Sequence, residues 1–386
     1  MADFSKKSRI VVTCSNRLAP YLEKEVIELG FKPVRVFKTG VELSGSLNDC
    51  IKLNLNLRCA SQVLYSLKEF KAESADELYQ FLMRIGWEDF VPADGYFSIT
   101  SNVNTPSITN TLFANVKVKD AIADRFRNKL NKRPDSGPET DRTVIHLYWK
   151  EDYAEIFVDT SGDTLSKHGY RKIPGKAPML ESLAAATLLA TNWDRRSAVV
   201  NPMCGSGTIA IEAALLATNS RPGLLRENYS FMHVVGYDEG SYEAEFKELE
   251  RKIISVPGLN IIATDISEDA VNISKINAGI AGVEELLEFE VCDFEKTKIP
   301  QENKGLIYFN PEYGDRLGVE IELEKTYKRI GDFMKKECKG YTGYIFTGNL
   351  ELAKKIGLKP RRRIEFYTSK IDCRLLEYEL YEGSKE

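Results

Sequence analysis

The amino-acid sequence predicts an α/β protein in which a smaller α+β region precedes a sheet of parallel strands. From residue 180 to the C-terminus, helix and strand patterns alternate, which is typical of a parallel α/β sheet. Residues 1–165 instead contain short strands and helices of the α+β kind. The composition, with 43% hydrophobic and 28% charged residues over 386 positions, is that of a folded protein of two or three domains.

Short strands and helices follow one another through the first 165 residues. Gly30 ends the first helical pattern, Gly40 marks a turn, and Pro134 follows a long amphipathic helix. We divide this region into two modules, residues 1–65 and residues 66–165. The periodicity predicts strands at residues 10–14, 34–43, 64–70, 96–103, 143–149 and 153–159, and helices at residues 18–29, 47–59, 75–85 and 111–128.

A third and larger domain is expected at residues 166–386. Its elements begin with a helix at residues 180–191 and a strand at residues 198–201. We interpret the GYDEG stretch at residues 236–240 as a solvated loop, because no strand leads into it. The remaining strands are expected at residues 260–264, 287–291, 305–309, 343–346, 362–367 and 373–380.

The composition limits which classes of protein and which cellular compartment we expect. The net charge is −4, so the overall balance does not indicate a nucleic-acid binder, and RNA binding must rest on local patches. Seven scattered cysteines, three histidines and the absence of a C-x-x-C pair predict reduced thiols and no structural metal site. The apolar runs are shorter than a membrane span, and the polar N-terminus is unlike a secretion signal, so we expect a soluble, cytoplasmic protein.

A glycine-rich loop directly follows the strand predicted at residues 198–201. Gly205 and Gly207 allow a tight turn and close approach of a ligand, and the helix behind them offers unpaired N–H groups. Residues 205–210 fit the dinucleotide fingerprint G-x-G-x-x-A, although a tight strand-to-helix turn of purely structural purpose has the same pattern. The acidic residue that should follow is Asp265, which lies 58 residues after Gly207, so an insertion separates the two.

Two carboxylates end the strands that come after the loop. Asp265 could accept both hydroxyls of a ribose, as any adenosine cofactor requires. Asp293 ends the next strand and could accept a hydrogen bond from an adenine amino group, while Phe294 or Ile266 packs the ring. A solvated loop carboxylate is the alternative for Asp293.

The stretch LIYFNPEYG brings a third set of polar groups to the same rim. The Asn310 side chain and the Pro311 carbonyl are two neutral acceptors side by side, and Tyr313 adds an aromatic face. Such a set suits an amino group on a flat base, whose hydrogens it can hold so that the nitrogen lone pair turns out of the ring plane. Tyr313 would stack on the extruded base.

Several of these stretches resemble known methyltransferase motifs. NPMCGSGT, TDISEDAV and NPEYGDRLG resemble motifs I, II and IV of amino-methylating enzymes that use S-adenosylmethionine. DTSGDTLSKHGYR, APMLESLAAATLL and KIDCRLLEYELY are similar to the RlmL-like family of THUMP-domain RNA methyltransferases. The likeness covers nearly the whole chain and is specific from residue 159 onward.

The resemblance implies a fold and an activity. A ferredoxin-like segment would occupy residues 1–65, a THUMP-like RNA-binding domain residues 66–165, and a Rossmann-like methyltransferase sheet residues 166–386. Methyl would pass from S-adenosylmethionine to the N2 amine of a guanosine in 23S ribosomal RNA. Transfer RNA guanosine, adenine, and a non-catalytic role as an RNA-binding assembly factor are the alternatives.

The resemblance also implies roles for individual residues on the matching motifs. The catalytic residues would be Asn310, Pro311 and Tyr313, and no metal or membrane partner is expected. Cys204 would pack in the loop without covalent chemistry. The cofactor would contact Asn201, Pro202, Cys204, Gly205, Ser206, Gly207, Thr208, Asp265, Ile266, Asp293 and Phe294.

One residue departs from the family pattern. Glu312 stands where motif IV usually has a second proline. Because the acceptors of Asn310 and Pro311 are kept, the chemistry is not lost with it. We hypothesise that Glu312 changes the rigidity of the loop or accepts a hydrogen bond from guanine N1–H.

Basic residues supply the candidate RNA contacts. Arg171 lies in the connector, where family members hold substrate, and residues 361–363 are either a solvated loop or a phosphate contact. His168 is interpreted as a solvated linker histidine. The main candidates cluster on and after the helix predicted at residues 111–128: Lys117, Lys119, Arg125, Arg127, Lys129, Lys132 and Arg133.

Overall fold

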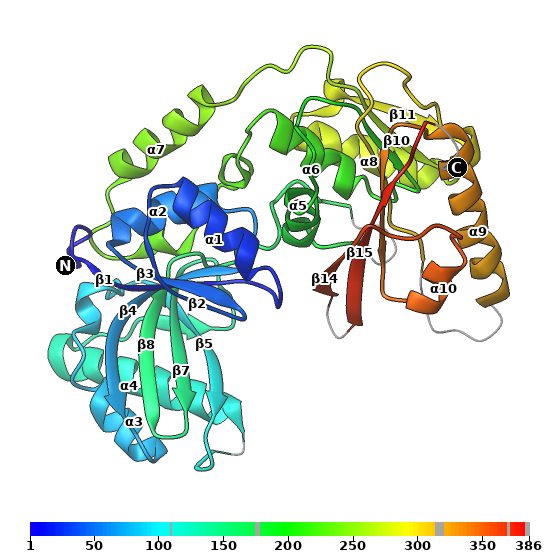
Figure 1. Cartoon of the computed structure of the whole chain (residues 1–386). Coiled ribbons are helices and arrows are strands. Elements are labelled where there is room, and N and C mark those ends of the chain that lie inside the picture. Colours follow the sequence, from blue (N-terminus) through cyan, green and yellow to red (C-terminus); the bar gives the residue numbers. More distant parts are fainter. Residues whose placement is uncertain (109, 174–177, 313–319, 369–370, 383–386) are drawn as a thin grey trace. The chain divides into compact units, whose positions relative to one another are not determined.

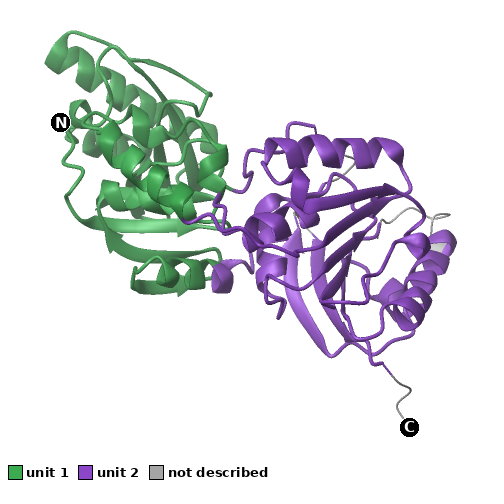
Figure 2. Cartoon of the chain, turned by 90° about the horizontal axis from the view of Figure 1, so that it is seen from above, with its two compact units in different colours: residues 1–14, 22–165, 222–251 green, residues 15–21, 166–221, 252–386 purple. Residues whose placement is uncertain are grey.

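The structure is a computed structural model, and it describes residues 1–108, 110–173, 178–312, 320–368 and 371–382. The chain forms two compact units, coloured in Figure 2. Unit 1 comprises residues 1–14, 22–165 and 222–251, and unit 2 comprises residues 15–21, 166–221 and 252–386. Within the described ranges, no helix has the length and the apolar character needed to cross a membrane.

Unit 1 contains one sheet of eight strands (Figure 1). Its central strand β4 (Gln62–Lys71) pairs antiparallel with β1 through residues 62–65 and with β8 through residues 64–71. The modules expected at residues 1–65 and 66–165 therefore share a continuous sheet. The other strands are β1 (Ser8–Thr13), β2 (Pro33–Phe37), β3 (Gly40–Gly45), β5 (Tyr96–Asn104), β6 (Asp135–Gly137), β7 (Thr143–Lys150) and β8 (Tyr153–Asp159), in the order β2-β3-β1-β4-β8-β7-β5-β6.

Local capping fixes the ends of several helices of this region. Ser46 and Asp49 form a reciprocal capping box at the start of α2, which satisfies two backbone N–H groups. Asn110 caps α4, and Asn131 ends it in the left-handed conformation with φ of 50°. The helices are α1 (Ala19–Glu28), α2 (Leu47–Asn56), α3 (Ala75–Leu82) and α4 (Thr111–Leu130), with a 3₁₀ turn η1 (Trp87–Asp89).

Residues 222–251 leave unit 2 and pack on unit 1, which the sequence pattern did not reveal. Ser230 accepts a hydrogen bond from the backbone of β7, at 2.9 Å from the Val144 nitrogen. Residues 236–240 were interpreted as a solvated loop. Asp238 is exposed, as expected, but Glu239 and Gly240 already belong to α7, and the Asp238 carboxylate accepts from two backbone N–H groups of its first turn. The segment contains η2 (Pro222–Leu225), η3 (Ser230–His233) and α7 (Glu239–Arg251).

Unit 2 is built on a doubly wound sheet of seven strands. β9 pairs parallel with β10 on one side and with β12 on the other, so the strand order reverses between β9 and β12. Ligands of such sheets bind outside the carboxyl ends of the strands at this reversal. The strands are β9 (Val199–Pro202), β10 (Ile261–Asp265), β11 (Leu287–Val291), β12 (Leu306–Phe309), β13 (Thr342–Thr347), β14 (Arg362–Thr368) and β15 (Ile371–Glu379), in the order β11-β10-β9-β12-β13-β15-β14.

Buried apolar residues hold the helices against this sheet. Residues 306–309 of β12 are fully buried, and Ile307 and Phe309 join one core cluster with Tyr327 and Phe333 of α9. All ten residues of α6 are buried, as expected for a helix that packs between a sheet and other helices. The helices are α5 (Glu181–Leu189), α6 (Thr208–Ala217), α8 (Glu268–Ile280), α9 (Glu320–Glu337) and α10 (Leu350–Lys354), with the 3₁₀ turns η4 (Glu284–Leu286) and η5 (Phe294–Lys296).

The packing of residues 222–251 on unit 1 predicts a large effect at one glycine. A Cβ on Gly223 would lie 2.4 Å from the Leu55 backbone, so Gly223→Ala should destabilise unit 1 by about 1–3 kcal/mol. Gly240→Ala is the control, because its Cβ would meet only the Asp238 carboxylate at 3.4 Å, and alanine should stabilise α7 by up to about 1 kcal/mol. Urea unfolding measures both, and equal stability of the two variants would contradict this packing.

Candidate cofactor and substrate site

The glycine-rich loop after β9 adopts a strained, closely packed turn. Met203, Gly205 and Gly207 have φ of 57°, 57° and 79°, in the left-handed region that favours glycine. A Cβ on Gly207 would lie 2.8 Å from the Ser274 hydroxyl, whereas a Cβ on Gly205 would meet nothing within 4 Å. Gly207 is therefore needed for packing, and Gly205 leaves open space beside the loop.

Side chains of α8 hold the backbone of this loop. Ser274 donates to the Gly205 carbonyl at 2.8 Å, and Asn277 donates to the Ser206 carbonyl at 3.2 Å. Neither residue was predicted from the sequence. Their spacing of three on a helix places them on one face, and this was the signal that could have found them.

Asp265 ends β10 in contact with the same loop. Its Oδ2 atom accepts from the Gly205 N–H at 3.0 Å, and its Oδ1 atom accepts from the Ser267 N–H at 3.0 Å. Each oxygen accepts one of these two bonds and keeps further accepting capacity, and the residue is partly exposed. The neighbouring Ile266 is 73% exposed, so its side chain is free to pack against a flat ring.

Of the two predicted cofactor residues after β11, Asp293 lies at the surface and Phe294 lies in the core. Asp293 is ion-paired with Arg329 of α9 at 2.8 Å. Phe294 is only 4% exposed, and its ring packs edge-on against Phe309 and Phe333. The prediction that the Phe294 ring packs on the adenine is therefore wrong, because this ring belongs to the core, and Ile266 is the better placed of the two.

The acceptors proposed for the reacting amine lie at the end of β12, which pairs directly with β9. Asn310 is partly exposed, and its side chain makes no hydrogen bond to any described residue. Pro311 is buried beside it. Glu312 is exposed, and its carbonyl accepts from the Tyr327 hydroxyl at 3.4 Å. Tyr313, the predicted stacking residue, lies outside the described residues.

The remaining residues of the loop motif are buried around it. Asn201 donates to the Tyr308 carbonyl at 2.9 Å, and its Oδ1 atom has no hydrogen-bond partner among the described residues. Cys204 is buried, and burial raises the pKa of its thiol to about 12, which suits packing and not nucleophilic attack. Pro202, Ser206 and Thr208 are buried as well.

His168 is part of the interior of unit 2. Its Nδ1 atom lies 2.7 Å from Oε1 of Glu212 on α6, and both side chains have no exposed surface. The interpretation as a solvated linker histidine was therefore wrong. Chain neighbours gave no hint of the partner, because Glu212 lies 44 residues away.

Arg171 is also turned inward. Its guanidinium donates to the Thr208 hydroxyl at 3.0 Å and to the Met179 carbonyl, and it pairs with Glu181 at 3.3 Å. The side chain is 9% exposed. This burial contradicts the predicted RNA contact, and Arg171 instead ties the start of α5 to the start of α6 behind the glycine-rich loop.

Four carboxylates form ion pairs with five of the seven cations predicted to form an RNA-binding patch. Among the described residues, Lys119 and Arg133 have no ion pair. The patch therefore offers less free charge than the sequence indicates. The pairs are Lys117 with Asp76, Arg127 with Asp124, Lys132 with Asp94, and both Arg125 and Lys129 with Glu88.

The arginines at residues 361–363 and a cleft in unit 1 are two further candidate surfaces. Of the arginines at residues 361–363, Arg362 is bound by the buried carboxylate of Glu377, so its charge is committed to the sheet. Unit 1 contains a cleft of about 550 Å³, which is separate from the residues predicted to bind the cofactor. It is lined by Pro92, Asp94, Gly95, Tyr96, Asp135, Arg142, Thr143, Met232, His233, Val234, Gly236 and Tyr237.

Family profiles match the chain in three consecutive parts. The RlmL ferredoxin-like domain matches residues 9–64, the THUMP domain residues 72–159, and the RMKL-like methyltransferase domain residues 168–377. The chain belongs to the RMKL-like methyltransferase family. The predicted fold class, a Rossmann-like methyltransferase sheet after ferredoxin-like and THUMP segments, is thereby confirmed.

Relatives of the whole chain share this arrangement. The chain is 34% identical to "Ribosomal RNA large subunit methyltransferase K/L" of Syntrophotalea carbinolica over 97% of its length and 54% of the relative. It matches the crystal structure of SMU.472 complexed with SAH with a TM-score of 0.88 and 26% identity, over 98% and 100% of the two chains. A "possible methylase" from Clostridium difficile 630 gives a TM-score of 0.87 and 29% identity, over 99% and 100%.

The chain spans about half the length of the curated relatives it matches. Its likeness to the solved structures instead covers almost all of both chains.

The buried pair of His168 and Glu212 predicts a strong dependence of unit 2 on the histidine. His168→Ala leaves a carboxylate buried without its partner and should lower the free energy of unfolding by about 3 kcal/mol. The exposed Lys172 is the control, and Lys172→Ala should change stability by less than about 0.5 kcal/mol. Urea unfolding tests this, and a small effect of His168→Ala would show that the pair is not buried as described.

Proposed function

We propose that the chain transfers a methyl group from S-adenosylmethionine to the exocyclic N2 amine of a guanosine in large-subunit ribosomal RNA. The observation that carries the proposal is the junction of β9 and β12. Pairing of these strands brings the glycine-rich loop and the acceptors of Asn310 and Pro311 to one edge of the sheet. The name of the Syntrophotalea relative supports ribosomal RNA as the substrate.

The residues at this edge fit S-adenosylmethionine. Open space beside Gly205 admits the ligand, and the unpaired Oδ1 atom of Asn201 can accept from its amino group. Asp265 accepts from the ribose hydroxyls through its remaining lone pairs, and Ile266 covers the adenine. The bound sulfonium supplies an electrophilic methyl carbon. The protein's part is to hold both reactants in line and to exclude water.

The substrate amine is held by two acceptors. The Asn310 side-chain oxygen and the Pro311 carbonyl each accept one N–H of the amine, so the nitrogen lone pair turns out of the base plane and toward the methyl carbon. We assign Tyr313 to stacking on the extruded base, since every base offers a flat face to an aromatic ring. Solvent takes the released proton after transfer, and no base of the protein is required.

We assign RNA binding to unit 1. Residues 1–65 and 66–165 are taken as its ferredoxin-like and THUMP parts, and residues 166–386 as the catalytic domain, of which the segment 222–251 packs in unit 1. Lys119 and Arg133 are the predicted cations that remain available to phosphates. The other five predicted cations form ion pairs within unit 1 and help to hold this surface in place.

Nucleoside mass spectrometry tests the reaction. Unmodified ribosomal RNA and transfer RNA are incubated with the protein and isotope-labelled S-adenosylmethionine. Labelled N2-methylguanosine in large-subunit RNA is the expected product. Label in transfer RNA or on adenine would identify a different substrate from the one proposed. Absence of label in spite of cofactor binding would favour a non-catalytic assembly factor.

Removal of the Asn310 acceptor should separate catalysis from cofactor binding. Asn310→Ala should lower kcat by about 100-fold, the order seen when one preorganised polar group is removed from an active site. The affinity for S-adenosylhomocysteine should stay within twofold, because Asn310 faces the amine. Gln301→Ala, in the exposed loop before β12, is the control. Full activity of Asn310→Ala would exclude the proposed role.

Two arginines of α4 and its exit should respond in opposite ways. Arg133→Ala should weaken RNA binding and reduce the salt slope by about 1, with thermal stability unchanged. Arg125→Ala should instead destabilise unit 1 by about 1–2 kcal/mol, because Arg125 binds Glu88 through two nitrogens and lowers the pKa of this carboxyl to about 2. Fluorescence titration and thermal unfolding distinguish them, and an RNA defect in Arg125→Ala alone would reverse the assignment.

A further inference from the structure

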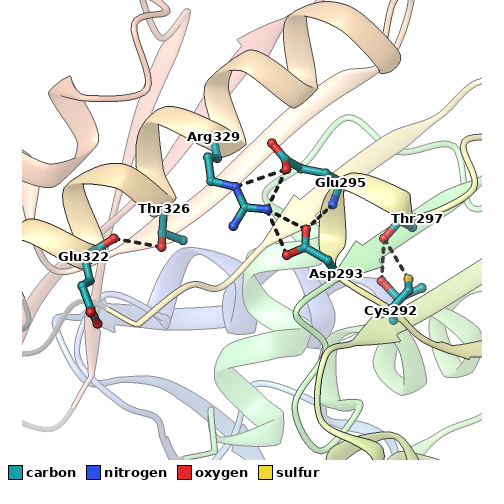
Figure 3. Close-up of polar contacts among 8 residues, drawn as sticks. Cys292, Asp293, Glu295, Thr297, Glu322, Thr326 and Arg329 are labelled. Carbon is teal, nitrogen blue, oxygen red and sulfur yellow. Dashed lines mark hydrogen bonds and ion pairs between the residues drawn. The ribbon is translucent and has the colours of Figure 1, made fainter.

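Arg329 of α9 binds two carboxylates at the rim of the proposed cofactor site (Figure 3). Its Nη2 atom lies 2.8 Å and 2.9 Å from the two oxygens of Asp293, and Nε and Nη2 both donate to Glu295 at 3.2 Å and 2.6 Å. We propose that Arg329 is a positioning residue that holds Asp293 as an acceptor for the adenine amino group and thereby lets the site reject a 6-oxopurine. This inference rests on the proposed function.

The two carboxylates need a cation between them. Asp293 and Glu295 lie two residues apart at the start of η5, so their like charges repel each other. Arg329 binds both and lowers the pKa of Asp293 in spite of its partial burial, which acts in the opposite direction. Asp293 is therefore ionised and can only accept hydrogen bonds.

The Asp293 carboxylate has little accepting capacity left, and it lies mainly on Oδ2. Oδ1 accepts from the Glu295 N–H at 3.0 Å and from Arg329, and Oδ2 accepts from Arg329. An ionised carboxylate accepts about four hydrogen bonds. With two on Oδ1 and one on Oδ2, a lone pair of Oδ2 remains. The side chain is 28% exposed, so this position can be reached by a ligand.

The guanidinium itself is held in place by packing. Its central carbon lies 4.8 Å from the centroid of the Phe294 ring, which is locked in the core by Phe309 and Phe333. The ring contact and the two carboxylates together orient the guanidinium before any ligand binds. A lysine would supply charge but neither the fork of donors nor the same stacking.

This arrangement distinguishes two purine edges. Adenine presents an N–H donor at position 6, which the open lone pair of Oδ2 accepts. Hypoxanthine presents a carbonyl oxygen there, which faces another acceptor and cannot hydrogen-bond to it. Arg329 therefore contributes to recognition of the adenosine end of the cofactor without a contact to it.

Calorimetry with two ligands tests the proposal. The full chain is titrated at pH 8 with S-adenosylhomocysteine and with S-inosylhomocysteine, its 6-oxo analogue. The wild type should prefer the adenosine ligand by about tenfold or more. In Arg329→Gln the preference should fall to less than about threefold, through weaker binding of S-adenosylhomocysteine alone. Lys328→Gln removes an exposed charge from the adjacent position of α9 and should keep the wild-type preference.

Each other outcome has a distinct meaning. Equal weakening of both ligands in Arg329→Gln would show a merely structural role and overturn the inference, as would an unchanged preference. If Arg329→Gln does not fold in thermal unfolding, Arg329→Lys serves instead, and its preference should lie between those of the wild type and the glutamine variant. If the wild type binds neither ligand, the proposed function itself fails.

Discussion

Parallel pairing of β9 with both β10 and β12 is the constraint on which the rest of unit 2 depends. Because the three strands end at one edge, the loops that follow them meet there, although their residues lie up to 109 positions apart, from Asn201 to Asn310. Backbone hydrogen bonds set this geometry, and side chains refine it. Ser274 and Asn277 secure the glycine-rich loop, and Asp265 ties its Gly205 N–H to β10.

Features encoded in consecutive residues could be predicted from the sequence. In unit 2, β10 begins with apolar residues and ends in Asp265, and β12 is an apolar run that Asn310 follows. Gly205 and Gly207 mark the turn, and both have a left-handed backbone. The first sheet was harder to delimit. The strand predicted at residues 64–70 already crosses the boundary between the two modules, but only the pairing of β4 with β1 and β8 shows that both modules share one sheet.

Features that depend on a distant partner could not be predicted. His168 was interpreted as solvated, yet it meets Glu212, which lies 44 residues away, in the interior. Arg171 looked like a substrate contact, and Phe294 like a ring beside the cofactor, but burial assigns both to the support of the site. In each case a charge or an aromatic face has two compatible environments, and tertiary packing selects one.

Net charge does not assign RNA binding to either unit. Residues 176–386 carry a net charge of −6 and residues 1–175 a net charge of +2, but the acidic segment 222–251 belongs to unit 1 and brings the net charge of that unit to −6. The attraction to phosphates that the proposed function requires must therefore come from local cations. Glu88 binds both Arg125 and Lys129, so these two cations of α4 form ion pairs within unit 1. A surface of this kind forms few contacts to phosphates, and its selectivity must arise from shape and from the bases it can reach.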